Sequence, residues 1–146
     1  MKIDQIELIS RLGKIFITVE VYEELSKCRF LIKPLVNEIH NGNIGLMESG
    51  DYSHLQKKYS RLGSGELSVI FCAKDKIAFI EDREAENAGR VEGVKVYNIP
   101  EVLLAGKMKG IFEETEIIKI ISELREKDGY VFRKEIEKEL TSFYNL

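Results

Sequence analysis

Acidic residues at three separate places along the chain have the types and spacing that catalysis needs. Glu24 lies in a predicted helix after a short β-rich segment, Glu66 opens another predicted helix, and Glu81 and Asp82 end a predicted strand. In an open parallel sheet, ligands gather at the carboxyl ends of the strands. Converging carboxylates repel one another and raise their pKa values unless a cation neutralises them. These residues therefore form a candidate site for Mg²⁺ or Mn²⁺, which oxygen ligands bind and which activate water at a phosphodiester.

The same residues have an ordinary interpretation as solvated surface. The chain holds 25 Asp and Glu residues, and neighbouring acidic residues usually line the exposed face of a helix. Residue types and spacing alone therefore favour a solvated face over a metal site.

Other catalytic patterns are absent from the sequence. His40 and His54 are the only histidines, and no Cys or His ligand spacing surrounds them. The glycines and serine at 63–65 lack the order of a nucleophile elbow, the Lys of a phosphate-binding loop and the third Gly of a dinucleotide fingerprint. We therefore expect no nucleophile triad, zinc site or nucleotide cofactor.

Length and charge limit the class of protein further. The 146 residues suit a single domain over 1–146, and 44% hydrophobic with 32% charged residues is ordinary for a globular chain. The net charge of −3 excludes a strongly basic nucleic-acid coat, although the 22 Lys and Arg residues leave room for a local basic groove. The candidates for phosphate contact are Lys57, Lys58, Arg61 and Arg83. The alternative for the first three is the solvated face of a polar helix.

The sequence favours a cytoplasmic location without a membrane partner. The longest apolar run, 69–73, is far shorter than the roughly 20 residues of a membrane span. Residues 1–14 have no apolar core of a signal peptide. Cys28 and Cys72 belong to no CxxC pair, so we expect two free thiols, buried as small hydrophobic residues.

Periodicity predicts alternating helices and strands that could bring the acidic residues together. The predicted strands are 14–18, 44–47, 76–80 and 94–99. The predicted helices are 3–12, 19–27, 31–41, 51–62, 64–72, 83–91, 100–109, a stripe over 117–124 that Gly129 ends, and 133–143. Short strand–helix–strand connections indicate an α/β fold with three α/β/α layers and a mostly parallel sheet.

Four segments in this order resemble the PIN-domain superfamily, in its small prokaryotic branch related to VapC-type toxins. These segments are 21–25 after a strand, 62–67, 80–85 after an apolar strand, and 102–110. The likeness covers nearly the whole chain, and the ordered set is more specific than any one segment.

The resemblance implies an Mg²⁺- or Mn²⁺-dependent endoribonuclease of the toxin–antitoxin type. It would carry Glu24, Glu66 and Asp82 as catalytic residues and metal ligands, with Glu81 as a further ligand. RNA as substrate, an antitoxin protein as partner and a homodimer belong to the same expectation.

The chain also departs from the family pattern. PIN domains begin with an apolar strand that ends in an Asp, and this chain begins at what resembles the following helix; Asp4 is a poor substitute because its context is helical. Glu86 stands where relatives usually carry Arg. Three interpretations follow: a degenerate, non-catalytic module that binds RNA or a protein, a site completed by a partner or second copy, or a sequence start that is set too late.

Overall fold

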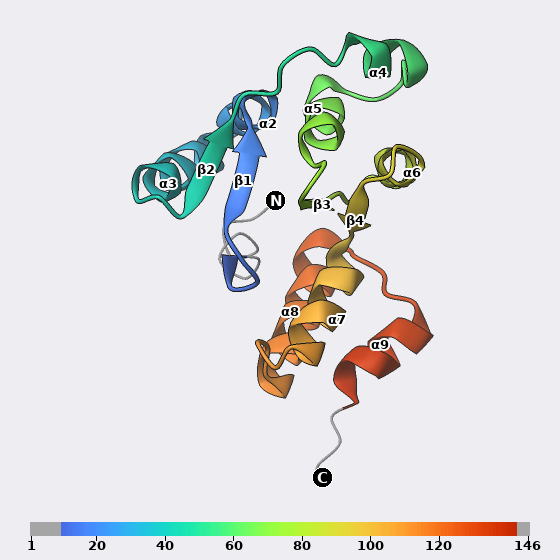
Figure 1. Ribbon diagram of the computed structural model, residues 1–146. Coiled ribbons are helices and arrows are strands. Elements are labelled where there is room, and N and C mark those ends of the chain that lie inside the picture. Colours follow the sequence, from blue (N-terminus) through green and yellow to red (C-terminus); the bar gives the residue numbers. More distant parts are fainter. Residues whose placement is uncertain (1–9, 143–146) are drawn as a thin grey trace. The chain divides into compact units, whose positions relative to one another are not determined.

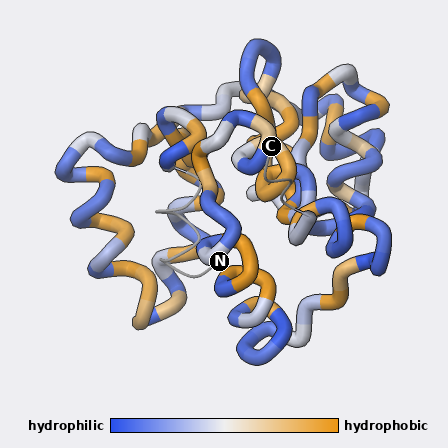
Figure 2. Tube along the Cα trace, turned by 90° about the horizontal axis from the view of Figure 1, so that it is seen from below, coloured by the Kyte–Doolittle hydropathy of each residue, from blue (hydrophilic) through white to orange (hydrophobic). Residues whose placement is uncertain are grey.

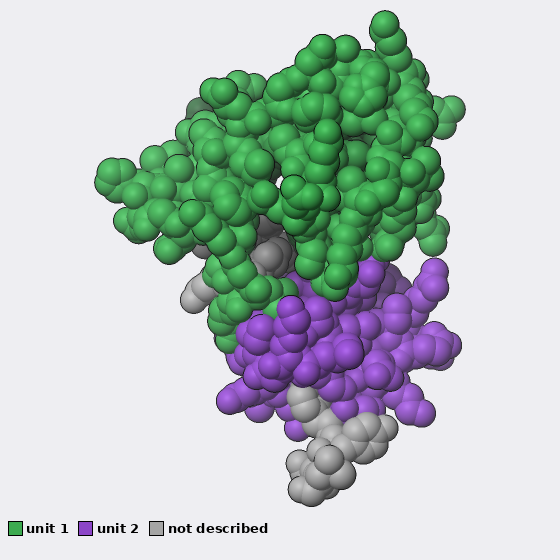
Figure 3. Space-filling view, in the orientation of Figure 1, with its two compact units in different colours: residues 1–97 green, residues 98–146 purple. Residues whose placement is uncertain are grey.

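The computed structural model describes residues 10–142 (Figure 1). The chain divides between Tyr97 and Asn98 into two compact units (Figure 3), and each is described by itself. A single domain over 1–146 stays a prediction. The predicted helix over 3–12 falls almost entirely outside the described residues.

The first part of the first unit is a parallel pair of strands with two helices between them. Strand β1 (Ile15–Thr18) pairs with β2 (Ile44–Met47) from Ile15 opposite Ile44 to Thr18 opposite Met47. Helices α2 (Val19–Ser26) and α3 (Arg29–His40) connect them. Alternate strand residues pack on Leu35, which is buried with Ile44, so one face of this sheet lies against α3.

A second parallel pair completes this unit. Helices α4 (Ser53–Lys58) and α5 (Ser64–Cys72) precede β3 (Ile77–Phe79), and α6 (Arg83–Val91) connects β3 to β4 (Lys95–Tyr97). The core here combines apolar residues of α5, of α6 and of one face of the sheet: Leu67, Ile70, Ala73, Ala78, Ile80, Ala85, Ala88, Val94 and Val96. Helix α6 packs against β4, and α5 packs against α6.

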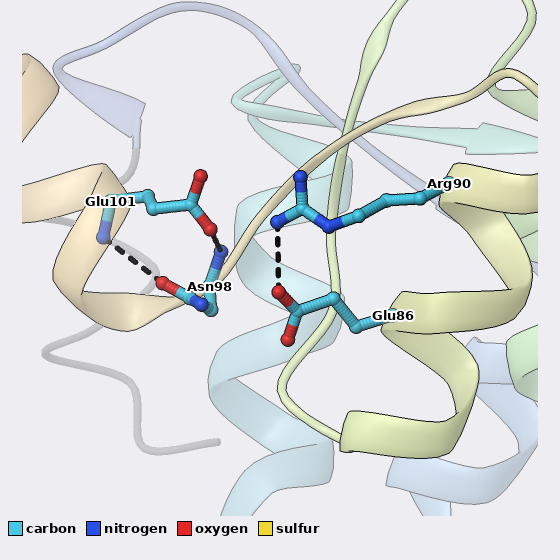
Figure 4. A network of polar contacts seen from close by, with 4 residues as sticks. All are labelled: Glu86, Arg90, Asn98 and Glu101. Carbon is cyan, nitrogen blue, oxygen red and sulfur yellow. Dashed lines mark hydrogen bonds and ion pairs between the residues drawn. The ribbon is translucent and has the colours of Figure 1, made fainter.

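The second unit consists of helices α7 (Ile99–Met108), α8 (Glu114–Asp128) and α9 (Lys134–Thr141). Asn98 and Glu101 form a capping box at the start of α7, with the Glu101 N–H donating to Asn98 at 3.1 Å (Figure 4). Gly106 lies so close to the buried Phe112 ring that a Cβ atom there would stand 2.1 Å from it. A substitution at Gly106 would therefore overpack this small core.

The structure confirms the predicted α/β class with parallel strands. Figure 2 shows hydrophobic and hydrophilic residues alternating along the helices, as expected for elements that bury one face. Strand β2 has the predicted bounds, whereas β3, β4 and α4 are shorter than predicted. The described strands form two two-stranded sheets, β1 with β2 and β3 with β4.

Two other predictions concern the thiols and membranes. Both cysteines are free thiols, but Cys28 is exposed and Cys72 is half-buried, so the predicted burial is wrong. Cys28 precedes α3 at its N-cap position, where its side chain points away from the core. Among the described helices, none is long and apolar enough to cross a membrane.

Candidate functional site

Glu24 lies on α2 and its carboxylate reaches the first turn of α5. The Thr18 hydroxyl oxygen starts α2 by accepting a hydrogen bond from the Val21 N–H at 3.2 Å. One carboxylate oxygen of Glu24 lies 2.7 Å from the point where a Cβ atom on Gly65 would stand. The absence of a side chain at Gly65 therefore lets the Glu24 carboxylate approach a helix N-terminus, which favours negative charge.

Glu66 is the half-buried member of the acidic group. Its carboxylate accepts a hydrogen bond from the Gly63 N–H at 3.2 Å, so it returns to cap the helix that it opens. Burial raises the pKa of Glu66, the Gly63 hydrogen bond opposes this, and the charges of Asp82, Glu24 and Glu84 raise the pKa further. The negative charges of Asp82 and Glu24 therefore both act on Glu66.

Asp82 follows β3 and is the N-cap of α6. Its carboxylate accepts a hydrogen bond from the Ala85 N–H at 2.9 Å. Glu81 beside it is exposed, and its charge is not among those that raise the pKa of Glu66. Glu84 acts on Glu66 instead, and the sequence reasoning missed it. The position of Glu84 in the first turn of α6, two residues after Asp82, could have indicated that it lies near the acidic group.

A chain of buried hydroxyl groups holds the segments that carry Glu24 and Glu66. The Ser68 hydroxyl donates its proton to the Gly65 carbonyl at 2.7 Å, and it lies 2.8 Å from the Thr18 hydroxyl. Because a serine hydroxyl has one proton, Thr18 must be the donor to Ser68. Thr18 and Ser68 are both buried, so this contact fixes the start of α2 against the first turn of α5.

The acidic group suits a hard divalent ion in its chemistry but not in its described geometry. Carboxylate oxygens are the ligands that Mg²⁺ and Mn²⁺ prefer. Within residues 10–142, however, no group of three or more His, Cys, Asp or Glu side chains is placed to hold one metal ion. The described carboxylates thus do not form a complete metal centre, and Asp4 lies outside the described residues.

A second polar cluster fixes the loop between β2 and α4. The Ser49 hydroxyl donates to the Glu20 carboxylate on α2, and Tyr52 also hydrogen-bonds to Glu20. The hydrogen bond to Glu20 is the largest cause that raises the pKa of Tyr52 to about 12, and burial adds to it. The cluster ties the loop to the first turn of α2, which contains Glu20.

The basic residues predicted to contact phosphate are divided by the structure. Lys58 forms an ion pair with Glu92 at 2.8 Å, and Glu92 also accepts a hydrogen bond from Tyr59. Arg61 and Arg83 are exposed.

On α6, Glu86 forms an ion pair with Arg90 at 2.8 Å (Figure 4). The residue that departs from the family pattern therefore engages an arginine one turn later on the same helix.

The described part of the chain is an α/β protein with parallel strands, and comparison with known families identifies its class more narrowly. A family model described as a PIN domain matches residues 1–144. The chain therefore belongs to the PIN-domain family, which confirms the resemblance noted in the sequence. Searches of curated proteins and of solved structures found no significant match. The missing first strand stays a prediction.

Proposed function

We propose that this chain is a cytoplasmic endoribonuclease of the toxin–antitoxin type that depends on Mg²⁺ or Mn²⁺. The proposal is supported by the PIN-domain match over residues 1–144 and by the Glu24 carboxylate, which reaches the first turn of α5 beside Glu66. Burial raises the pKa of Glu66, and the charges of Asp82 and Glu24 add to this, because like charges repel. A divalent cation bound there would relieve this repulsion.

The residues would act through their charges. Glu24 and Asp82 contribute negative charge that attracts the cation, with Glu81 beside Asp82 as a further oxygen donor. Glu66 would hold the metal with them, and the three carboxylates would orient the water that attacks the phosphodiester.

A second candidate is a PIN-like module that binds RNA or a protein without cleaving RNA. It is favoured by the use of the carboxylates in the described structure, where Asp82 caps α6 and Glu66 caps α5. It is also favoured by the absence of a complete metal centre among residues 10–142. In this function, the acidic residues would stabilise helix ends and would hold no ion.

Metal titration and RNA cleavage distinguish the two candidates. We expect the wild type to bind Mn²⁺ in calorimetry and to cleave a labelled RNA only when the metal is present. Glu24→Gln and Asp82→Asn should weaken both, whereas Glu23→Gln, an exposed neighbour on α2, should weaken neither. Lack of Mn²⁺ binding at millimolar concentration, together with no cleavage above that of Asp82→Asn, would exclude the nuclease and leave the binding module.

The proposal also includes an antitoxin protein as partner and a homodimer. Sedimentation of the purified chain tests the dimer. Purification of the chain together with the product of a neighbouring reading frame tests the antitoxin. A monomer that associates with no such product would remove this part of the proposal, and the RNA cleavage assay would still decide the rest.

A further inference from the structure

Phe16 on β1 is an exposed aromatic residue that two lysines surround. It is 40% exposed although it belongs to a strand. The ammonium groups of Lys14 and Lys76 lie 5.3 Å and 5.5 Å from the centre of its ring. Lys14 directly precedes β1 and Lys76 directly precedes β3, so two distant segments bring positive charge to one ring. We call Lys14, Phe16 and Lys76 the Phe16 patch.

The lysines of the Phe16 patch have no acidic partner at ion-pairing distance among the described residues. Within residues 10–142, neither Lys14 nor Lys76 takes part in an ion pair. Two ammonium groups beside the same ring repel each other, and an anion between them would relieve this repulsion. Both ammonium groups lie over the ring, so a flat ligand that stacked on Phe16 would take their place there and meet them with its charged groups. An anionic ligand with flat rings therefore complements the patch.

A similar pair stands at the start of the neighbouring strand. Lys95 is the first residue of β4 and lies opposite Ile77, the residue after Lys76. Its ammonium group lies 5.6 Å from the centre of the Tyr97 ring, and Ile77 is 50% exposed. Lysines thus precede or open three of the four described strands, and each lies beside an aromatic ring.

The Phe16 patch is separate from the acidic group. Lys14 and Lys76 stand at the amino ends of β1 and β3, whereas Thr18 and Asp82 stand at or after the carboxyl ends. The strands therefore carry positive charge at one end and negative charge at the other. A polyanion would be repelled by the acidic end in the absence of a cation and attracted to the lysine end.

We propose that the Phe16 patch binds single-stranded RNA, with a base stacked on Phe16 and phosphates at Lys14 and Lys76. Stacking on aromatic rings beside a basic track is how proteins bind single strands without sequence preference. The inference rests on RNA as the ligand of the proposed function, but it concerns a surface that contains none of the acidic residues. RNA binding here needs no divalent ion, so it is separable from cleavage.

Fluorescence anisotropy with a labelled 12-nucleotide single-stranded RNA in EDTA tests the patch. Phe16→Leu keeps an apolar side chain over Gly45 and removes the ring face. It should weaken binding about 5- to 150-fold, which corresponds to the loss of one stacked base. Phe30→Leu is the matched control, because Phe30 is 88% exposed on α3, and it should bind like the wild type.

The lysines have a different expected signature. Lys14→Gln with Lys76→Gln should weaken binding and reduce the slope of log affinity against log salt by about 1.4, since each phosphate contact to a single strand contributes about 0.7. Lys27→Gln with Lys33→Gln removes the same charge from exposed positions on other segments and should leave the slope unchanged. Phe16→Leu should also leave the slope unchanged.

Three results would overturn the inference. The patch variants could bind RNA like the wild type, or the control variants could lose as much affinity as the patch variants. The wild type could also form a dimer in sedimentation that Phe16→Leu dissociates while RNA binding persists, which would make the patch a protein contact. A failure of metal-dependent cleavage would contradict only the proposed nuclease, because the binding assay contains EDTA.

Discussion

The Glu24 carboxylate and Gly65 are in such close contact that no side chain fits between them. A Cβ atom on Gly65 would stand 2.7 Å from a Glu24 carboxylate oxygen and 3.6 Å from a Val21 methyl group. The closer atom is the end of a flexible side chain, so it can move away without disturbing the backbone. Gly65 therefore determines where the Glu24 carboxylate lies more than it determines the stability of α5.

Gly65→Ala separates the position of Glu24 from the stability of the fold. An alanine in α5 favours the helix by roughly 0.5–1 kcal/mol, and displacement of the Glu24 carboxylate offsets part of this. The midpoint of urea unfolding should therefore change little. Mn²⁺ affinity and RNA cleavage should fall on the order of 10- to 100-fold, because the carboxylate is displaced. Gly13→Ala, where a Cβ atom meets nothing within 4 Å, is the control and should change neither. Unchanged Mn²⁺ affinity in Gly65→Ala would contradict a metal role for Glu24.

Asp82 has a capping role that two substitutions distinguish from a role in metal binding. Asp82→Asn keeps an oxygen that accepts from the Ala85 N–H, so the free energy of unfolding should stay within a few tenths of a kcal/mol. Asp82→Ala removes the cap and should cost about 0.5–2 kcal/mol. Both should weaken Mn²⁺ binding in calorimetry, because both remove the charge. If Asp82→Asn binds Mn²⁺ like the wild type, the residue caps α6 and does no more.

The raised pKa of Glu66 predicts a decrease of stability with rising pH. The native state holds the Glu66 proton to a higher pH than the unfolded state does, whose ordinary value is 4.5. The stability that Glu66 contributes is therefore complete below pH 4.5 and falls as the pH rises from there through the native pKa. Glu66→Gln can keep the cap and does not ionise, so its stability relative to the wild type should increase between pH 4 and pH 7. Urea unfolding at both pH values measures this.

The contribution of the Asp82 charge to the raised pKa of Glu66 is tested by making Glu66→Gln in a chain that also carries Asp82→Asn. With Asp82→Asn present, one of the charges that raise the pKa of Glu66 is gone. The increase in stability of Glu66→Gln, relative to the same chain with Glu66, between pH 4 and pH 7 should then be smaller than in the wild-type background. An equal gain in both backgrounds would show that the Asp82 charge does not raise the pKa of Glu66.

Tyr52 should titrate later than an ordinary tyrosine because of Glu20. Its pKa of about 12 lies above the ordinary value of 10, so its contribution to stability is complete below pH 10 and is lost as the pH rises toward 12. Glu20→Gln should lower the pKa of Tyr52 toward 10, since it removes the charge. The difference between absorbance titrations with and without Tyr52→Phe isolates this residue among the six tyrosines. A Tyr52 pKa that Glu20→Gln leaves unchanged would contradict the link.

The sequence predicted most elements because periodicity and turn residues report local structure. It predicted α6 and β2 with their bounds. It also predicted α5 over 64–72, but not that Gly63 is its N-cap and that the Glu66 side chain returns to this residue. Such reciprocal caps depend on a side-chain rotamer, which a pattern of residue types does not fix.

The candidate site could be predicted only as a set of segments. Asp82 follows a strand and Glu66 lies in the first turn of a helix, as the pattern of strands and helices predicted. Their convergence at one edge of a sheet stays a prediction, because the described strands form two separate sheets. The distances among the carboxylates depend on helix packing over non-local contacts such as that of Glu24 with Gly65. The involvement of Glu84 and the use of Asp82 as a cap depend on the same details. The sequence therefore predicted the elements that carry these residues, and their common metal site stays a prediction.

The contact between Thr18 and Ser68 has a consequence for how this chain can diverge. Loss of the Ser68 hydroxyl would leave the buried Thr18 hydroxyl without its acceptor, which costs about 1–3 kcal/mol. Loss of the Thr18 hydroxyl would also remove the N-cap of α2, which costs about 0.5–2 kcal/mol. Apolar substitution at either position would thus be selected against, and we expect both positions to keep hydroxyl side chains among descendants of this sequence.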